Sequence, residues 1–144
     1  MIRKAEARDS VVLSELFDAL GYEAPAAAIP DRLARLVAND WATALVAEEG
    51  GKVIGLATGH VLPTLHHTGQ LGRLTVLVVA PDVRGRGVGR RLVEAIETWV
   101  KSKGCAKIAV TTALHRSGAH TFYERLGYEH TGRRYHKVLS DASG

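Results

Sequence analysis

The sequence is poor in cysteine, aromatic residues and long apolar runs, and each shortage excludes a class of protein. Cys105 is the single cysteine, so no intrachain disulfide can form, which fits a reducing compartment. No apolar run approaches the roughly 18 residues that span a bilayer. Met1–Glu6 leads straight into charged sequence, without the apolar stretch of a signal peptide. We therefore expect a cytoplasmic protein with no membrane partner.

The length and composition are those of one ordinary globular domain. The chain has 144 residues, of which 46% are apolar and 24% charged. A chain of about 150 residues buries about 70% of its unfolded surface, so its core needs neither metal nor disulfide. Repeats and low-complexity linkers are absent, and we expect a single domain over residues 1–144.

Positive charge is concentrated in one segment. The formal net charge is +4, and Arg84, Arg86, Arg90 and Arg91 lie beside glycines. Aromatic residues, at 6%, do not alternate with them as a platform for single-stranded nucleic acid would require. The cluster favours one compact polyanion, and we predict no nucleic-acid partner. A nucleic-acid-binding module stays an alternative, whose affinity would fall steeply with salt.

Hydrophobic periodicity and turn residues predict alternating strands and helices. Strands are expected at residues 2–7, 44–48, 53–62, 71–79, 107–112, 128–131 and 135–139, with a hairpin turn at Glu49–Lys52. Helices are expected at about 10–20, with an apolar face of Val12, Leu13, Leu16, Phe17 and Leu20; from residue 30, with Leu33, Leu36 and Val37; at about 90–103, with Leu92, Val93, Ile96, Trp99 and Val100; and at 117–126. Gly21, Gly104 and Gly127 are the expected helix ends. Val76–Val79 is apolar on both faces, which indicates a central strand. The order predicts an α/β fold with a mixed, mostly antiparallel central sheet flanked by helices on both faces.

The segment Arg84–Gly89 joins a buried strand to the clearest helix. Its glycines allow close approach of the backbone to a ligand, and the helix start presents free N–H groups to an anion. The dinucleotide fingerprint fails because Arg90 stands where its third glycine belongs, and the nucleotide-hydrolase phosphate loop fails because no Gly-Lys-Ser/Thr follows. A glycine-rich turn with solvated arginines remains as the other interpretation.

Two motifs resemble those of the GNAT superfamily of N-acetyltransferases. Arg84–Gly89 is similar to its R/Q-x-x-G-x-G/A motif, Leu77–Pro81 to the preceding V-x-P approach, and Ala119–Tyr128 to its A-x-x-F/L-Y-x-x-x-G-F/Y motif. The resemblance implies the acyl-CoA N-acyltransferase fold. It also implies direct transfer of acetyl from acetyl-CoA to a primary amine of a small molecule or a protein. Dimers are common in the family, so a homodimer is possible.

The resemblance also implies which residues hold the cofactor. Backbone N–H groups of the loop would bind the pyrophosphate, and the preceding strand would pair with the pantetheine arm and polarise the acetyl carbonyl. Arg116 stands where many relatives have an asparagine that contacts the cofactor. The implied cofactor-binding residues are Leu77, Val78, Val79, Arg84, Gly85, Arg86, Gly87, Val88, Gly89, Arg90 and Arg116.

Tyr123 occupies the position of the family's general acid, which protonates the departing thiolate. The alternative interpretation is a core aromatic beside Phe122. Direct transfer leaves Cys105 no covalent role, and we expect a small buried hydrophobic residue there.

The residue that often serves as general base in the family has no counterpart at the corresponding position of this sequence. Relatives often have a glutamate on the strand before the loop, but Arg73–Val76 contains no carboxylate. His60, His66, His67 or an ordered water are the replacements left open. His115 and His120 are five residues apart, off the helical spacing of a metal pair, so we expect no metal.

A non-catalytic acyl-CoA-binding regulatory domain of the same fold is the alternative function. The missing glutamate favours it, whereas Tyr123 argues against it. In this fold the acceptor is chosen by the first two helices and by the loop before the central strand, here about Tyr22–Ile29 and Pro63–Gln70. Neither segment has the acidic cluster that a polyamine or aminoglycoside requires, and the acceptor and the acyl preference stay open.

Overall fold

The computed structural model describes residues 1–111, 117–132 and 135–140. The chain divides into two compact units, Met1–Val110 and Thr111–Gly144, and each is described by itself.

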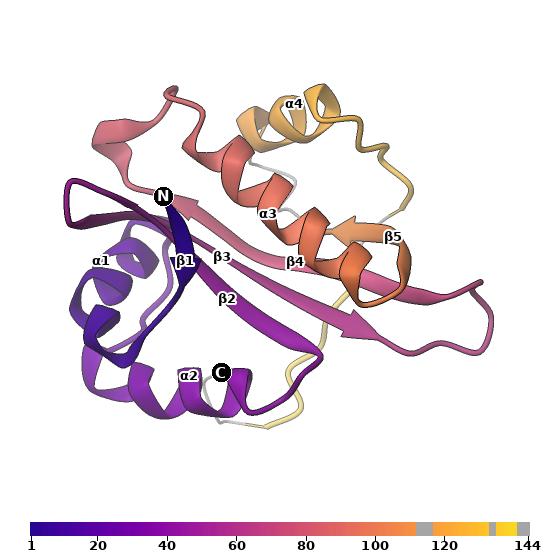
Figure 1. The fold of residues 1–144 in the computed structure, drawn as a ribbon, viewed down its shortest axis with the longest axis horizontal. Coiled ribbons are helices and arrows are strands. Elements are labelled where there is room, and N and C mark those ends of the chain that lie inside the picture. The colour runs from indigo at the N-terminus through magenta and orange to yellow at the C-terminus, as the bar shows by residue number, and fades with distance from the viewer. Residues whose placement is uncertain (112–116, 133–134, 141–144) are drawn as a thin grey trace. The chain divides into compact units, whose positions relative to one another are not determined.

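The first unit is built on a five-stranded sheet in the order β1-β2-β3-β4-β5 (Figure 1). The first four strands are antiparallel to their neighbours, and β5 runs parallel to β4. The mixed, mostly antiparallel sheet expected from the sequence is therefore confirmed. The strands are β1 (Ile2–Lys4), β2 (Ala42–Glu49), β3 (Lys52–Leu62), β4 (Gln70–Val79) and β5 (Cys105–Val110).

The hairpin between β2 and β3 turns at its predicted residues. Glu49 pairs with Lys52, and Gly50 and Gly51 have φ of 59° and 79°. Two consecutive positive φ values define the turn that matches the right-handed twist of a hairpin, and glycine adopts them without steric cost.

Two helices cover one face of this sheet. They are α1 (Ser10–Leu20) and α2 (Ile29–Val37), each preceded by a short 3-10 turn, at Ala7–Asp9 and Ala26–Ala28 respectively. The predicted apolar stripe of α1 packs into a core with Val46, Leu56 and Val78 of the sheet. On α2, Leu33 and Leu36 join this core. Val37 was also expected there, but it lies past the inward face and is 49% exposed.

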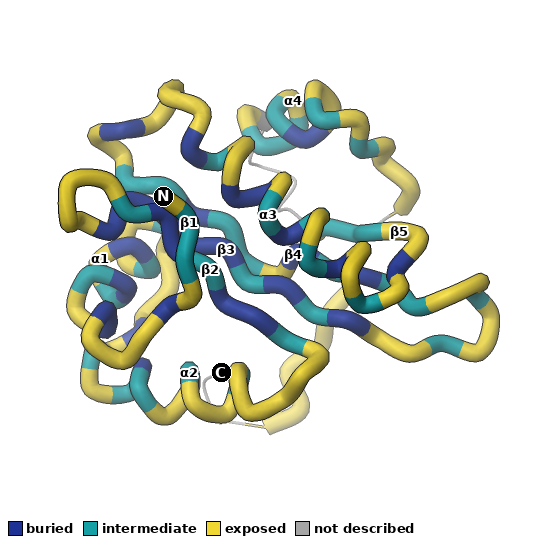
Figure 2. Tube along the Cα trace, viewed as in Figure 1, coloured by how far each residue is buried: buried dark blue, intermediate teal, exposed yellow. Residues whose placement is uncertain are grey.

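The opposite face carries α3 (Val88–Ser102), which links β4 to the parallel strand β5 (Figure 1). Its buried side chains repeat every three or four residues: Val88, Leu92, Val93, Ile96 and Val100. Trp99, which was also expected on this stripe, is only partly buried. They lie over glycines of β3 and β4, where the sheet has no side chains to hold the helix away. Figure 2 shows the buried track along β3 beneath the helix.

Gly72 on β4 marks the tightest approach of α3 to the sheet. A Cβ at this position would lie 2.8 Å from Cβ of Val100, a stiff β-branched side chain. We expect Gly72→Ala to lower the free energy of unfolding by about 1–3 kcal/mol, the usual cost of overpacking a core. Urea unfolding measures this loss. Gly118→Ala is the matched control, because a Cβ at Gly118 meets nothing within 4 Å. Equal stability of both variants would show that α3 shifts freely on the sheet.

The second unit contains α4 (Ser117–Arg125). Gly127 follows with φ of 90°, and the Tyr128 amide donates to the Tyr123 carbonyl, which ends the helix as predicted. The strands expected at residues 128–131 and 135–139 were wrong, since those residues form no strand. In the second of these segments the apolar side chains are exposed, Tyr135 to 88% and Leu139 to 90%, so alternation alone did not indicate burial.

Among the described residues, no helix has both the length and the apolar character that crossing a bilayer requires.

Candidate functional site

A glycine-containing loop leads from the end of β4 to the start of α3, where the sequence places the anion site. After the 3-10 turn Pro81–Val83, Arg84 is extended, and Gly85 and Gly87 have φ of 85° and 80°. Gly87 is the N-cap of α3 and has no side chain with which to cap it. The helix therefore starts with its first amides exposed toward an incoming group.

The first turn of α3 has the geometry of an anion site. The amides of Val88, Gly89 and Arg90 precede the first intrahelical bond, from the Arg91 amide to the Gly87 carbonyl. The helix dipole adds partial positive charge at the same place. The Val88 side chain points into the core and is 1% exposed, so this residue offers a ligand its backbone only.

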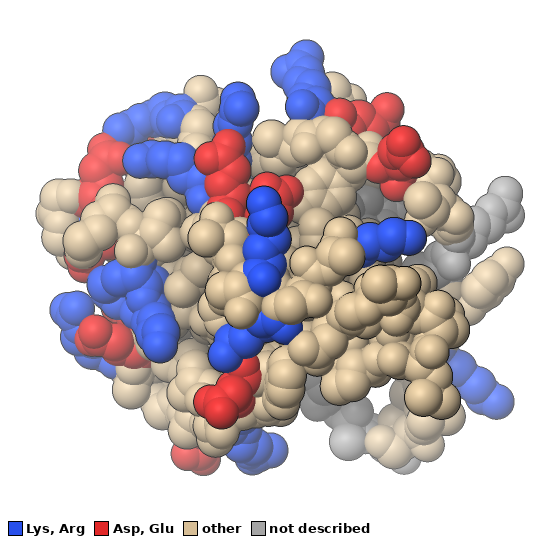
Figure 3. All heavy atoms as spheres, turned by 45° about the vertical axis from the view of Figure 1, so that its right-hand side comes forward, with Lys and Arg blue, Asp and Glu red and all other residues tan. Residues whose placement is uncertain are grey.

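The arginines around the loop are exposed and weakly tied. Arg86 pairs with Glu49, and Arg90 pairs with Glu94 at 2.9 Å. Exposed pairs of this kind stabilise by about 0–1 kcal/mol, so either guanidinium can turn to a phosphate at little cost. Arg84 and Arg91 have no ion pair within the described chain. The face in Figure 3 shows basic side chains interspersed with acidic ones, and no unbroken basic surface extends over it.

The strand before the loop has a free edge. The β4–β5 ladder runs from Gln70↔Cys105 to Leu74↔Val110. Beyond it, Val76–Val79 pairs with β3 on one side, and no strand of the described chain pairs with the other. Backbone donors and acceptors are thus open to an extended ligand that adds to the edge. Leu77, Val78 and Val79, the residues predicted to contact the pantetheine arm, lie on this edge.

A bulge on β4 places a threonine beside His60. Thr58 pairs with Val76 and Gly59 with Leu74, so Thr75 between them is an extra residue without a β3 partner. The Thr75 Oγ1 lies 2.6 Å from Oγ1 of Thr58 and 3.1 Å from Nδ1 of His60. Such a bulge comes from strand register, which the sequence does not reveal.

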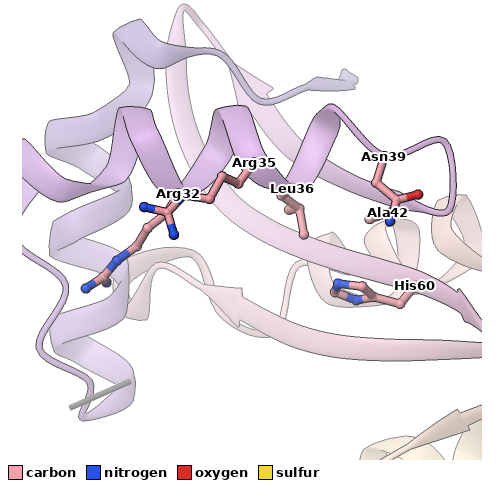
Figure 4. A pocket seen from close by; sticks show the side chains of 6 residues that line it. All are labelled: Arg32, Arg35, Leu36, Asn39, Ala42 and His60. Atoms are coloured by element: carbon pink, nitrogen blue, oxygen red, sulfur yellow. The ribbon is translucent and has the colours of Figure 1, made fainter. Parts of the chain in front are cut away.

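His60 lines a pocket between α2 and the sheet with a cavity volume of about 390 Å³. Figure 4 shows the His60 ring on the β3 side and the arginine side chains extending from α2. The remaining lining is mostly from the α2 region, and the full set is Arg32, Arg35, Leu36, Asn39, Ala42 and His60. Sequence reasoning assigned the acceptor to the first two helices and a loop, at about residues 22–29 and 63–70, but it did not single out the residues of α2 that line this pocket.

The structure separates the three candidate base histidines. Burial, and then the positive charge of Arg73 on the neighbouring strand, lower the pKa of His60 below its ordinary 6.5. His60 is therefore neutral at pH 7 and able to accept a proton. His66 and His67 contact each other in the β3–β4 loop, with ring centroids 4.1 Å apart and ring planes tilted by 43°, and His66 is exposed.

In the second unit Tyr123 is 9% exposed, and burial raises its pKa to about 12. It stays protonated at neutral pH, as a proton donor must. Its ring packs edge-on against Phe122 and Tyr128, with centroids 5.1 and 5.6 Å away. Arg116 and His115 lie outside the described residues.

A glycine loop at a helix start, after a strand with a free edge, is an arrangement suited to an extended phosphate-bearing ligand. The profile described as the Acetyltransferase (GNAT) family matches residues 12–128 of this chain. The chain therefore belongs to the GNAT family of acetyltransferases, and the resemblance seen in its motifs is confirmed.

Individual relatives agree with the family. Over 94 residues the chain is 33% identical to an aminoalkylphosphonate N-acetyltransferase of Salmonella typhimurium strain LT2. This match covers 65% of the chain and 61% of that relative, so it spans less than two thirds of the relative's length. A putative acetyltransferase of Agrobacterium tumefaciens strain C58 is 30% identical with a TM-score of 0.82, covering 95% of this chain and 99% of that one.

The fold recurs in more distant structures. Aminoglycoside N-acetyltransferase AAC(6')-Iy, solved in complex with CoA, has a TM-score of 0.84 at 22% identity, covering 97% of this chain and 95% of that one. At this identity the likeness shows the fold alone. The expected acyl-CoA N-acyltransferase fold is thereby confirmed.

Proposed function

We propose that this protein transfers the acetyl group of acetyl-CoA directly to a primary amine. The observation that carries the proposal is the continuity between the free β4 edge and the exposed amides at the start of α3. The free β4 edge suits an extended amide-containing arm, and the start of α3 suits a pyrophosphate. The curated relative's name as an N-acetyltransferase supports a nitrogen acceptor here.

Two parts of acetyl-CoA, the pyrophosphate and the pantetheine arm, bind along the elongated site. The pyrophosphate lies at Gly85–Arg90, bound by backbone N–H groups and by Arg84, Arg86 and Arg90. Arg86 and Arg90 give up their ion pairs with surface glutamates to bind it. The pantetheine arm runs along Leu77–Val79. The CoA complex of a protein with the same fold supports this assignment. A backbone N–H on β4 donates to the thioester oxygen, which becomes more negative as the amine attacks.

His60 is the proposed general base. A protonated amine cannot attack a carbonyl, and the Arg73–Val76 stretch has no carboxylate to deprotonate it. Thr75 holds Nδ1 of His60 and leaves Nε2 as the nitrogen that takes the amine proton. The amine nitrogen then bonds to the acetyl carbon, the carbon–sulfur bond breaks, and Tyr123 protonates the thiolate. The products are the N-acetyl amide and CoA.

The free Cys105 is buried, and burial raises the pKa of its thiol. A buried protonated thiol is a poor nucleophile, which supports direct transfer without an acetyl-cysteine intermediate. We propose the cytoplasm as the site of action, where acetyl-CoA is available and the cysteine stays reduced. The acceptor of the acetyl group is a small molecule or a protein amino group.

Acetyl-CoA is expected to raise the melting temperature of the protein by about 5–10 °C at about 100 times its Kd. That concentration stabilises the folded state by about 2.7 kcal/mol, and each kcal/mol moves Tm by about 2–4 °C at this size. Thermal scanning measures the shift. Pantetheine, which lacks the pyrophosphate, serves as control ligand and should give a small shift. No shift at saturating acetyl-CoA would refute the proposed function.

Gly87→Ala and Gly21→Ala form a matched pair for the same scan. Both glycines have positive φ, 80° and 94°, and open space where a Cβ would go, so both variants carry similar strain without ligand. Only Gly87→Ala should lose the response to acetyl-CoA. An unchanged response would move the pyrophosphate away from this loop.

A further inference from the structure

The pocket beneath α2 contains two arginines and no acidic side chain. The arginines, Arg32 and Arg35, line it with His60. The acidic residues nearest in sequence, Asp31 and Asp40, do not line it. Its only other polar side chain is Asn39, whose amide oxygen accepts a hydrogen bond from the Trp41 amide.

The charge in this pocket is not compensated by the protein. Arg32 and Arg35 are three residues apart on a helix, so their side chains leave from adjacent positions and repel each other. Neither makes an ion pair within the described chain, whereas Arg86 and Arg90 beside the loop each have a glutamate partner. A bound anion between them would remove the repulsion and accept bidentate hydrogen bonds.

A third arginine, Arg73, adds to the positive electrostatic potential near His60. Arg73 pairs directly across the sheet with His60, so both side chains leave the same face. The positive charge of Arg73 is felt at His60. Its Nε is buried and has no hydrogen-bond partner in the described chain. Arg73 thus supplies positive charge at His60 itself, and Arg32 and Arg35 supply it on the α2 side of the pocket.

The basic pocket adjoins the position proposed for the reacting amine. His60 belongs to the pocket lining and is also held by Thr75, the bulge residue at the start of the free β4 edge. A molecule with an amine at one end and an anion at the other matches this distribution of charge along the pocket lining. The amine would lie at His60 and the anion at Arg32 and Arg35.

We propose that the acceptor is an amine that carries an oxyanion, such as a carboxylate or a phosphate, and that Arg32 and Arg35 bind this group. The inference rests on the proposed acetyl transfer. Cationic acceptors such as polyamines are excluded by the same charges, since a second ammonium in the pocket would be repelled. Arg32 and Arg35 are then specificity-determining residues, and they take no part in the chemical step.

The test compares amines matched in length and differing in charge. 4-Aminobutyrate is set against pentylamine and 1,4-diaminobutane, and O-phosphoethanolamine against ethanolamine, with CoA-thiol release as the readout. We expect kcat/KM for the amines with an anionic far end to exceed, at least tenfold, that of the amines whose far end is uncharged or cationic. The phosphate and carboxylate arms show which oxyanion is preferred. Equal values across charge classes would overturn the inference while leaving the transferase function intact.

Variants of the two arginines test whether these residues bind the anionic group of the acceptor. Arg32→Gln with Arg35→Gln should remove the preference by raising KM for anionic amines at least tenfold more than KM for pentylamine. Lys101→Gln, at an exposed site on α3, is the control and should keep the preference. A double variant that still prefers anionic amines would refute the assignment.

A binding measurement separates this inference from the proposed function. Butyrate and ethyl phosphate, which have no amine, are titrated into labelled protein and followed by NMR. Shifts at His60 and along α2, absent in the double arginine variant, support the anion site even where no amine is acetylated. Absence of such shifts overturns it, whatever the transferase assay gives.

Discussion

Replacing His60 with glutamine is expected to lower kcat/KM for acetyl transfer about 100-fold. General bases contribute about 10²–10⁴-fold, and glutamine keeps a polar side chain of similar size while losing the basic nitrogen. The affinity for acetyl-CoA should not change, because the cofactor is assigned to the loop and the β4 edge. Stopped-flow or steady-state CoA release gives the rate, and calorimetry gives the affinity.

The other candidate histidines provide the controls. His66→Gln and His67→Gln change the β3–β4 loop, where the two rings contact each other and His66 is exposed, and both variants should keep wild-type rates. If His66→Gln or His67→Gln loses activity while His60→Gln keeps it, the general base lies in the β3–β4 loop. Wild-type activity in all three would assign deprotonation to water.

The pH profile gives an independent check on His60. Burial and Arg73 lower its pKa below 6.5, so the rate should fall as the pH drops through that lowered value. The same shift affects stability: the unfolded histidine binds a proton more readily, so stability is full above pH 6.5 and decreases as the pH falls toward the folded pKa. Thr75→Val, which removes the hydrogen bond to Nδ1, should shift the acidic limb and lower kcat with little effect on the acetyl-CoA affinity.

Local signals predicted most of the first unit and the anion loop. Gly21 and Gly104 end their helices where the sequence places the stops, and Gly50-Gly51 makes the expected turn. The loop of residues 84–89 was recognisable because its function depends on backbone conformation, which glycine spacing encodes directly. Strand positions before and after it followed from apolar runs of suitable length.

The acceptor side was not predictable in the same way. Thr75 stands next to His60 only because β4 bulges, and the basic pocket forms only because α2 packs beside β2 and β3. Such juxtapositions depend on register and helix packing between residues tens of positions apart. The failed strands after Gly127 have a related cause, since alternation of apolar residues indicates a strand only where a partner strand exists.

Tyr123→Phe is expected to reduce kcat by about 100-fold or more and to leave the acetyl-CoA affinity within about twofold of wild type. A buried thiolate-forming step needs a proton source, and phenylalanine keeps the ring contacts with Phe122 and Tyr128 while losing the hydroxyl. That hydroxyl makes no hydrogen bond within the described chain, so its removal should not change the melting temperature. Single-turnover kinetics and a thermal scan measure both quantities.

Tyr135→Phe is the matched control, because Tyr135 is 88% exposed and its hydroxyl removal should leave kcat unchanged. The pKa of Tyr123 near 12 adds a second criterion: the hydroxyl stays protonated through the working range, so its ionisation should produce no loss of kcat below about pH 10. A purely packing role for Tyr123 predicts that Tyr123→Phe matches wild type in rate as well as in stability. A rate loss without a stability loss therefore separates the proton donor from the core aromatic, and equal rates would assign the proton to water.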